Sequence, residues 1–91
     1  MNLIGRLEGS GKLIADSQEF TRVRYDLEVW QSDSGVRLAR GNLSVSPQIG
    51  PGKLTLRDGE TIEIFVTTSG RQGSTVIVMG DVPAPGEHRT F

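Results

Sequence analysis

Arginine and tryptophan side chains at strand-like spacing form the strongest binding pattern in this sequence. Guanidinium groups bind phosphate, and an indole ring stacks on a base or a sugar. The side chains concerned would project from one face of two neighbouring segments: Arg22, Arg24, Trp30, Arg37 and Arg40. Asp26 and Glu28 interrupt the positive charge of this face. The pattern therefore predicts a mixed surface suited to a protein partner or to a single-stranded nucleic acid.

Two aromatic side chains bear on the kind of partner. Trp30 has two interpretations: it is buried if the strand register sets it against Leu38, and otherwise it is free to stack on a ligand. Phe65 alternates with Ile64 and Val66 and so points outward, toward a second layer, a barrel end or a subunit contact. We expect a non-catalytic interaction module that binds a protein or a second copy of itself. A single-stranded nucleic-acid binder is the alternative.

Acid–base chemistry finds little support in the sequence. Asp26 and Glu28 share a strand face about 7 Å apart, a separation that suits two carboxylates across a scissile bond. Arg22 and Arg24 lie on that same face and favour an ordinary solvated surface of mixed charge. The single histidine, His88, stands in a proline-broken segment, where no partners hold an imidazole as a catalytic triad requires. We predict no catalytic residues and no enzyme activity.

Metal and cofactor chemistry is also poorly provided for. The chain has no cysteine, which excludes disulfides, thiolate catalysis and cysteine-based zinc or iron–sulfur sites. Residues 9–12 end in the glycine–lysine pair of a phosphate-binding loop, but Leu13 stands where that loop has serine or threonine, and no helical pattern follows. We therefore expect neither a metal nor a cofactor.

Length and charge limit the class of protein. The 91 residues suit one domain, which we place at residues 1–82, with a flexible C-terminal tail at residues 83–91. A net charge of -1 gives no overall attraction to nucleic acid. The first residues lack the apolar core of a signal peptide, and no run approaches the roughly 20 apolar residues of a membrane helix. We expect a cytoplasmic protein that does not bind a membrane.

The elements that must position these side chains are strands. The 12 glycines are spread at turn-like intervals, and apolar residues alternate with polar ones between them. In the segment 20–31 the alternate residues of one face would be buried: Val23, Tyr25, Leu27 and Val29. The length of this segment predicts that the strand bends or passes between two layers. The whole pattern predicts a small antiparallel barrel or sandwich of six to seven strands joined mainly by hairpins, with no substantial helix.

Turn chemistry gives finer predictions. A three-residue hairpin loop at residues 57–59 would keep Leu54 and Ile62 on the same side of the sheet, so we prefer it to a two-residue turn. The apolar residues of the segment 36–46 fall out of step with one another, which predicts a β-bulge at residues 40–41. Register and facing in this hairpin therefore depend on that bulge.

One segment leaves the number of strands open, and another predicts a strand in the interior. Residues 3–15 form either two short strands or one bent strand, and the apolar run 76–79 predicts a strand with both faces inside.

In general outline the pattern is similar to small barrels such as OB-folds, some of which bind oligonucleotides. The helix often found between the third and fourth strands of such barrels has no counterpart at residues 46–52. This resemblance rests on no motif and transfers no residue roles.

Overall fold

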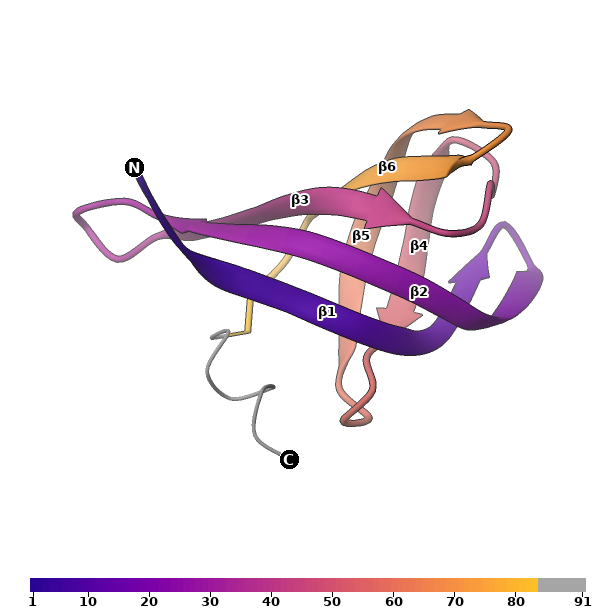
Figure 1. The fold of residues 1–91 in the computed structure, drawn as a ribbon, viewed down its shortest axis with the longest axis horizontal. Coiled ribbons are helices and arrows are strands. Elements are labelled where there is room, and N and C mark those ends of the chain that lie inside the picture. The colour runs from indigo at the N-terminus through magenta and orange to yellow at the C-terminus, as the bar shows by residue number, and fades with distance from the viewer. Residues whose placement is uncertain (84–91) are drawn as a thin grey trace.

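The computed structural model describes residues 1–83, which form a closed barrel of six antiparallel strands (Figure 1). In chain order the strands are β1 (Asn2–Ala15), β2 (Gln18–Gln31), β3 (Arg37–Leu43), β4 (Gly50–Thr55), β5 (Thr61–Gly70) and β6 (Gly73–Val78). Around the barrel their order is β1-β2-β3-β6-β5-β4, and β4 closes the circle by pairing with β1. The predicted all-β antiparallel fold is confirmed, as a barrel with one continuous N-terminal strand.

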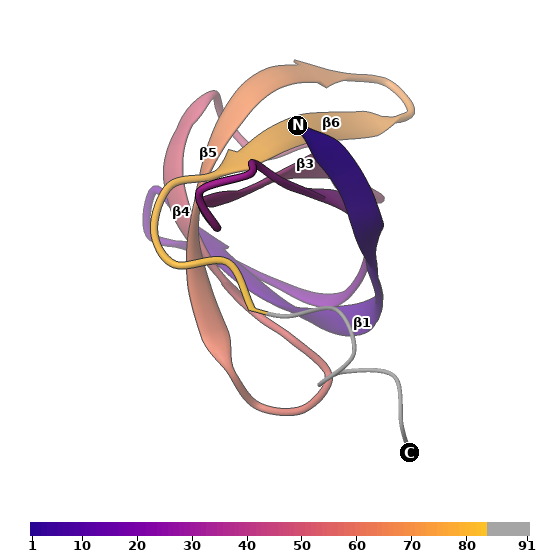
Figure 2. The same ribbon diagram turned by 90° about the vertical axis from the view of Figure 1, so that its left-hand side faces the viewer.

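The chain builds the barrel from two sets of three consecutive strands. β1, β2 and β3 run together as long hairpins, and β4 and β5 cross them steeply, so that the strands surround a common interior (Figures 1 and 2). Residues 44–49 connect β3 to β4, which are not neighbours in the barrel. On the way they meet the β5–β6 hairpin, where Ser74 Oγ donates a hydrogen bond to the carbonyl of Val45 at 2.9 Å. Because OB-folds have five strands, the resemblance is limited to the small-barrel architecture.

Alternation of side chains along each strand sends one face into the core. The predicted inward residues of β2 are each no more than 4% exposed: Val23, Tyr25, Leu27 and Val29. They belong to a single buried cluster with the inward side chains of the other strands, among them Leu54 and Ile64. Burial of one such side chain contributes about 1.5–3 kcal/mol. Period-two burial is therefore the main source of stability in this barrel.

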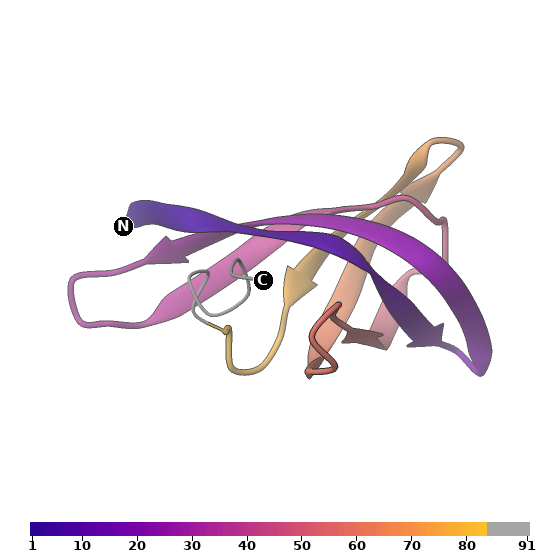
Figure 3. The ribbon, with the colours of Figure 1, turned by 60° about the horizontal axis from the view of Figure 1, so that its bottom comes forward.

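Irregular positions let the long strands bend around this core. β2 has a β-bulge, where two of its residues stand between consecutive register pairs and β1 has only one. Arg22 lies at this bulge and takes a left-handed φ of 55°. A bulge increases local bend and twist, and Figure 3 shows β1 and β2 curving together toward the turn that joins them. At Gly41 a Cβ atom would overlap the carbonyl oxygen of Asp26 on β2, so the close approach of β2 and β3 requires glycine. The bend predicted for β2 is confirmed.

The β4–β5 hairpin has the three-residue loop that the sequence predicts. Leu54 pairs directly with Ile62, and both side chains are buried. The Leu56 amide donates to the Glu60 carbonyl at 2.7 Å and so closes the loop. Gly59 has a φ of 93°, which glycine adopts without strain. The apolar pattern thus identified the loop length correctly where the Asp-Gly dipeptide alone favoured a shorter turn.

The bulge predicted at residues 40–41 is wrong. β2 and β3 pair in one continuous register along the whole of β3. Ala39 and Leu43 supply the core side chains of β3, whereas Leu38 lies on the outer face and is 50% exposed. The prediction failed because it required every apolar residue of this segment to be buried, and folded proteins leave many apolar side chains at the surface.

β6 also has one buried face rather than the two predicted. Val76 and Val78 are buried, whereas Ile77 is 39% exposed and Met79, just beyond the strand, is 58% exposed. The apolar run suggested an interior strand, but in this barrel no second layer of described residues covers the outer face of β6. Ile77 and Met79 therefore contribute to an apolar surface.

The end of the described chain packs against the barrel. Val82 and Pro83 are buried. The remainder of the predicted tail, residues 84–91 with His88, lies outside the described residues.

Candidate interaction surface

An apolar groove lies on the outer face of three neighbouring strands. Trp30 of β2 pairs directly with Leu38 of β3, and Ile77 of β6 pairs with Arg40 of β3. These side chains surround a hollow of about 420 Å³ whose walls are mostly apolar. We call this hollow the Trp30 groove, and its walls are Met1, Trp30, Leu38, Ala39, Arg40, Ile77 and Val78.

The Trp30 groove combines uncovered apolar groups with one cation. Met1 is 59% exposed, and Leu38 half exposed. Arg40 forms no ion pair within residues 1–83, although Glu28 lies directly across from it on β2. Tryptophan and arginine, which are enriched in protein-binding hot spots, both line this groove.

Trp30 itself is partly buried. This agrees with the interpretation that its strand register sets it against Leu38. Its Nε1 atom is buried and has no hydrogen-bond partner among the described residues. A buried N–H without an acceptor costs about 1–3 kcal/mol. The unpartnered N–H is therefore a local cost to the stability of the described chain.

A second apolar hollow, of about 640 Å³, surrounds Phe65 on the adjoining strands. Phe65 faces outward, as predicted, and pairs with Pro51 of β4 on one side and Ile77 of β6 on the other. Ile14 and Met79 also line this hollow. Because Ile77 lines the Trp30 groove as well, the apolar surface continues from the groove across β6 to β5.

The structure separates the arginines that the sequence placed beside Trp30. Arg22 and Arg24 lie toward the opposite end of β2, about 20 Å or more from Trp30 at about 3.3 Å per residue. Arg37 shares the inward-facing side of β3, since the register is continuous, and does not line the groove. Of these arginines, Arg40 alone lies beside Trp30. The predicted face is therefore not one patch.

Arg6 of β1 bridges the two carboxylates in the middle of the β2 face. Its guanidinium lies 3.1 Å from the Asp26 carboxylate and 3.5 Å from that of Glu28. All three side chains are well exposed, so each ion pair contributes at most about 1 kcal/mol. The sequence signal for Arg6 was absent, because the alternation of β2 does not reveal which residues a neighbouring strand sets against it. Asp26 and Glu28 form part of a charged surface network.

Inside the barrel, Tyr25 links Arg57 to the end of β2 that carries Arg22 and Arg24. Its hydroxyl accepts a hydrogen bond from the Arg57 amide at 3.0 Å. Burial raises the pKa of Tyr25 above its ordinary value, and the hydrogen bond from Arg57 offsets part of this rise. The role of Tyr25 is structural, since its hydroxyl is directed to a loop amide of the same chain.

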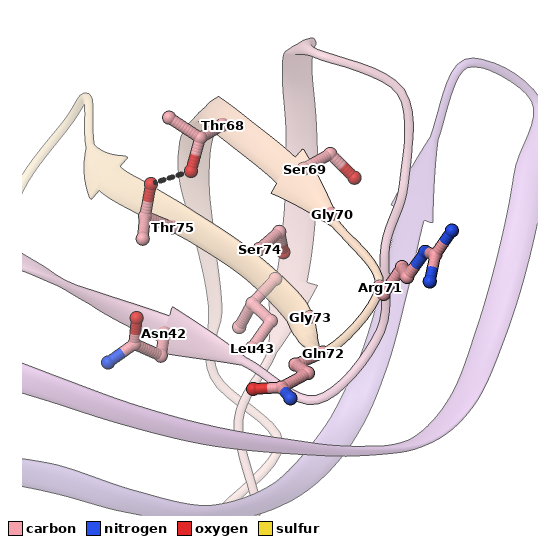
Figure 4. A pocket seen from close by; sticks show the side chains of 10 residues that line it. All are labelled: Asn42, Leu43, Thr68, Ser69, Gly70, Arg71, Gln72, Gly73, Ser74 and Thr75. Carbon is pink, nitrogen blue, oxygen red and sulfur yellow. Dashed lines mark hydrogen bonds between the residues drawn. The ribbon is translucent and has the colours of Figure 1, made fainter.

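A polar hollow of about 660 Å³ lies at the tip of the β5–β6 hairpin (Figure 4). Thr68 and Thr75 share a hydrogen bond of 2.6 Å across the hairpin, and Asn42 of β3 faces the same hollow. Among residues 1–83, Arg71 is the one charged side chain that lines it. The arrangement offers hydrogen bonds but no pair of titratable groups for acid–base chemistry.

Among residues 1–83, no three His, Asp or Glu side chains gather closely enough to hold a metal ion. No helix in that part of the chain is long and apolar enough to cross a membrane.

No family model, curated protein or solved structure matches this chain. At the Trp30 groove, side chains from three strands converge on a shared apolar floor beside Arg40, which forms no ion pair within residues 1–83. Sequence reasoning found Trp30 and Arg40 but missed Leu38 and Ile77, whose outward facing follows only from the register.

Proposed function

We propose that this chain is a non-catalytic interaction module whose Trp30 groove binds an extended segment of a protein partner. The observation that carries the proposal is the convergence of Trp30, Leu38 and Ile77 on an uncovered groove with Arg40 at its rim. Contiguous exposed apolar surface marks interaction sites in soluble proteins. Tryptophan and arginine are also enriched among the residues that carry most of the binding energy in interfaces.

The chemistry of the groove specifies that of the partner segment. An apolar side chain of the partner would fill the space between Trp30, Leu38 and Ile77. A carboxylate next to it would pair with Arg40, which has no partner of its own among the described residues. Because paired strands hold these walls, little ordering cost opposes binding. We expect the ligand to combine an apolar residue with a neighbouring aspartate or glutamate.

A single-stranded nucleic acid is the alternative ligand. Trp30 and Arg40 could stack on a base and pair with a phosphate, but such binders use a continuous positive track along the strand. Asp26 and Glu28 stand between Arg24 and Trp30 on the outer face of β2 and interrupt such a track. Titration with oligothymidylate at low salt tests the alternative, which predicts quenching of Trp30 emission and steep weakening with salt. We expect no change in emission.

Parallel selection from a phage-displayed library of random peptides tests the proposed function. Wild-type chain and the Leu38→Asp variant are immobilised and carried through the same rounds. We expect wild type to recover peptides that join an apolar residue to an acidic one. These peptides should bind Leu38→Asp at least about tenfold more weakly, because the new carboxylate enters the apolar floor and repels their acidic group.

Val36→Asp is the matched control for this selection. Val36 is 57% exposed in the same hairpin as Leu38 but does not line the groove. Circular dichroism of both variants checks that the barrel is retained. Recovery of no peptide, or of peptides that bind Leu38→Asp as tightly as Val36→Asp, would contradict the proposal.

A further inference from the structure

We propose that two copies of this chain associate through the outer edge of β1, where residues 5–9 pair antiparallel about a two-fold axis at Leu7. This edge is separate from the Trp30 groove. The inference therefore goes beyond the proposed function, and neither depends on the other.

β1 leaves a long stretch of backbone unpaired on one side. It pairs with β2 along its whole length but with β4 only from Lys12 to Ala15. Within residues 1–83 no strand pairs with the other edge of β1 before Lys12, and Figure 1 shows β1 at the border of the β1–β2–β3 set. Residues 2–11 contain neither proline nor lysine, which commonly protect a sheet edge. This edge can therefore accept a further strand.

The sequence along this edge is self-complementary. Residues 5–9 read Gly-Arg-Leu-Glu-Gly. In antiparallel pairing about Leu7, Arg6 lies opposite the partner's Glu8, and Glu8 lies opposite the partner's Arg6. Opposite charges set directly across an antiparallel pair stabilise it, and a two-fold axis forms each such contact twice.

The charges within one chain leave Glu8 without compensation. Glu8 pairs in register with Asp26 on β2, and like charges directly opposite destabilise a sheet. Asp26 has Arg6 at 3.1 Å, whereas Glu8 forms no ion pair with any residue of the described chain. A second copy would bring a guanidinium to Glu8. The unmet charge therefore favours a second copy over an unrelated strand.

A bulge limits how far the two strands can pair. The β1–β2 register shifts between Leu3 and Gly5, so the regular part of the free edge begins at Gly5. Leu3 and Ile4 just before it are 49% and 42% exposed. A paired segment as short as residues 5–9 gives a small interface, and small interfaces are weak and transient. We expect a dimer that forms in the micromolar range or above.

Sedimentation equilibrium of the full chain at low salt tests this assignment with a charge reversal at Glu8. We expect wild type to show a concentration-dependent monomer–dimer equilibrium. Glu8→Arg should raise the dimer dissociation constant at least about tenfold, since it sets like charges opposite each other twice. Asp33→Arg is the matched control, because it makes the same change in charge at an exposed position in the β2–β3 turn and should leave the equilibrium unchanged.

Two further measurements separate loss of this dimer from loss of the fold. Glu8→Arg removes the repulsion with Asp26, so its monomer should unfold at a higher temperature than wild-type monomer, and loss of dimer cannot then be ascribed to unfolding. An equimolar mixture of Glu8→Arg and Arg6→Glu should restore dimers, because each edge then complements the other. If Arg6→Glu does not fold, the Glu8→Arg comparison still decides the matter.

Wild type that stays monomeric up to millimolar concentration would overturn the inference. So would a dimer that Glu8→Arg leaves as tight as Asp33→Arg does. The outcome is independent of the groove, since Leu38→Asp should keep the wild-type dimer equilibrium while losing its peptide ligands.

Discussion

The two ends of the outer face of β2 share one strand and one alternation, yet they form different surfaces. At one end Trp30 meets Leu38 and joins an apolar groove. At the other, Arg22 and Arg24 lie on a bulged, exposed stretch whose register partners on β1 include Ser10. The strands alongside supply the difference, because β3 and β6 bring Leu38 and Ile77 to the Trp30 end only. Alternation assigns a side chain to a face, and strand order decides which side chains make a site.

Truncation of one leucine on each face of the sheet should give the largest difference in unfolding free energy between the inner and outer faces. Leu27 of β2 is fully buried, whereas Leu38 on the outer face is half exposed. Leu27→Ala should lower the free energy of unfolding by about 2–5 kcal/mol through lost burial and a cavity. Leu38→Ala should lower it by less than about 1 kcal/mol. Urea unfolding followed by circular dichroism measures both, and equal losses would show that the two faces are assigned incorrectly.

The close approach of β2 and β3 holds the two ends of the β2 face in place. A Cβ atom at Gly41 would overlap the carbonyl oxygen of Asp26, which is backbone and cannot rotate away. Gly41→Ala should therefore cost about 1–3 kcal/mol of unfolding free energy. Gly70→Ala is the control, because a Cβ there meets no atom within 4 Å. A Gly41→Ala variant as stable as the control would mean that the strands are further apart than described.

The ionisation of Tyr25 tests how tightly the barrel packs at the end of β2 that carries Arg22 and Arg24. Burial raises the pKa of its hydroxyl, so the neutral form is favoured in the folded state. The corresponding stability is fully present below the ordinary tyrosine pKa of about 10 and is lost as pH rises through the folded-state pKa. Absorbance near 295 nm should show this single tyrosine ionising later in folded than in urea-unfolded chain. Tyr25→Phe should lose less stability than wild type over that pH range, and identical losses would exclude this contribution.

The smallest change in unfolding free energy is expected from loss of the Arg6 ion pairs, which lie between the two ends of the β2 face. Arg6→Gln removes the ion pairs with Asp26 and Glu28, all at exposed side chains. The unfolding free energy should fall by less than about 1 kcal/mol at low salt, and the difference should shrink in 1 M NaCl. Arg71→Gln, at a residue with no ion pair inside the described chain, should change little. A larger loss that persists in high salt would assign Arg6 a packing role.

Whether a side chain points into the barrel or outward could be predicted from the sequence wherever polar residues alternated with apolar ones. The segment around Val23 and Leu27 was assigned correctly because its other face is charged. The loop at residues 57–59 followed from the same parity. Alternation failed for the segments around Leu38 and Ile77, because there outward residues are apolar too and the pattern no longer distinguishes the faces.

The candidate site could be predicted only in part, for a related reason. Trp30 and Arg40 were found by residue type, whereas the groove depends on which strands lie beside them. In the barrel β6 lies beside β3, although residues 44–72 separate the two strands in the sequence, and no local pattern indicates this neighbour. The same holds for Arg6, whose position opposite Glu28 is a consequence of the β1–β2 register. Arg37 was placed wrongly because the bulge assumed beside it is absent.

A nuclear magnetic resonance titration of the isotope-labelled chain, with a peptide recovered by the wild-type selection, shows whether the ligand occupies the Trp30 groove. The single tryptophan gives one indole N–H signal, which reports on the groove separately from the backbone amides. We predict that this signal and the amides of Leu38 and Ile77 shift with peptide concentration, while those of Arg22 and Arg24 stay in place. Shifts confined to Arg22 and Arg24, with an unmoved indole signal, would instead place the ligand at the opposite end of β2 and rule out the Trp30 groove as its site.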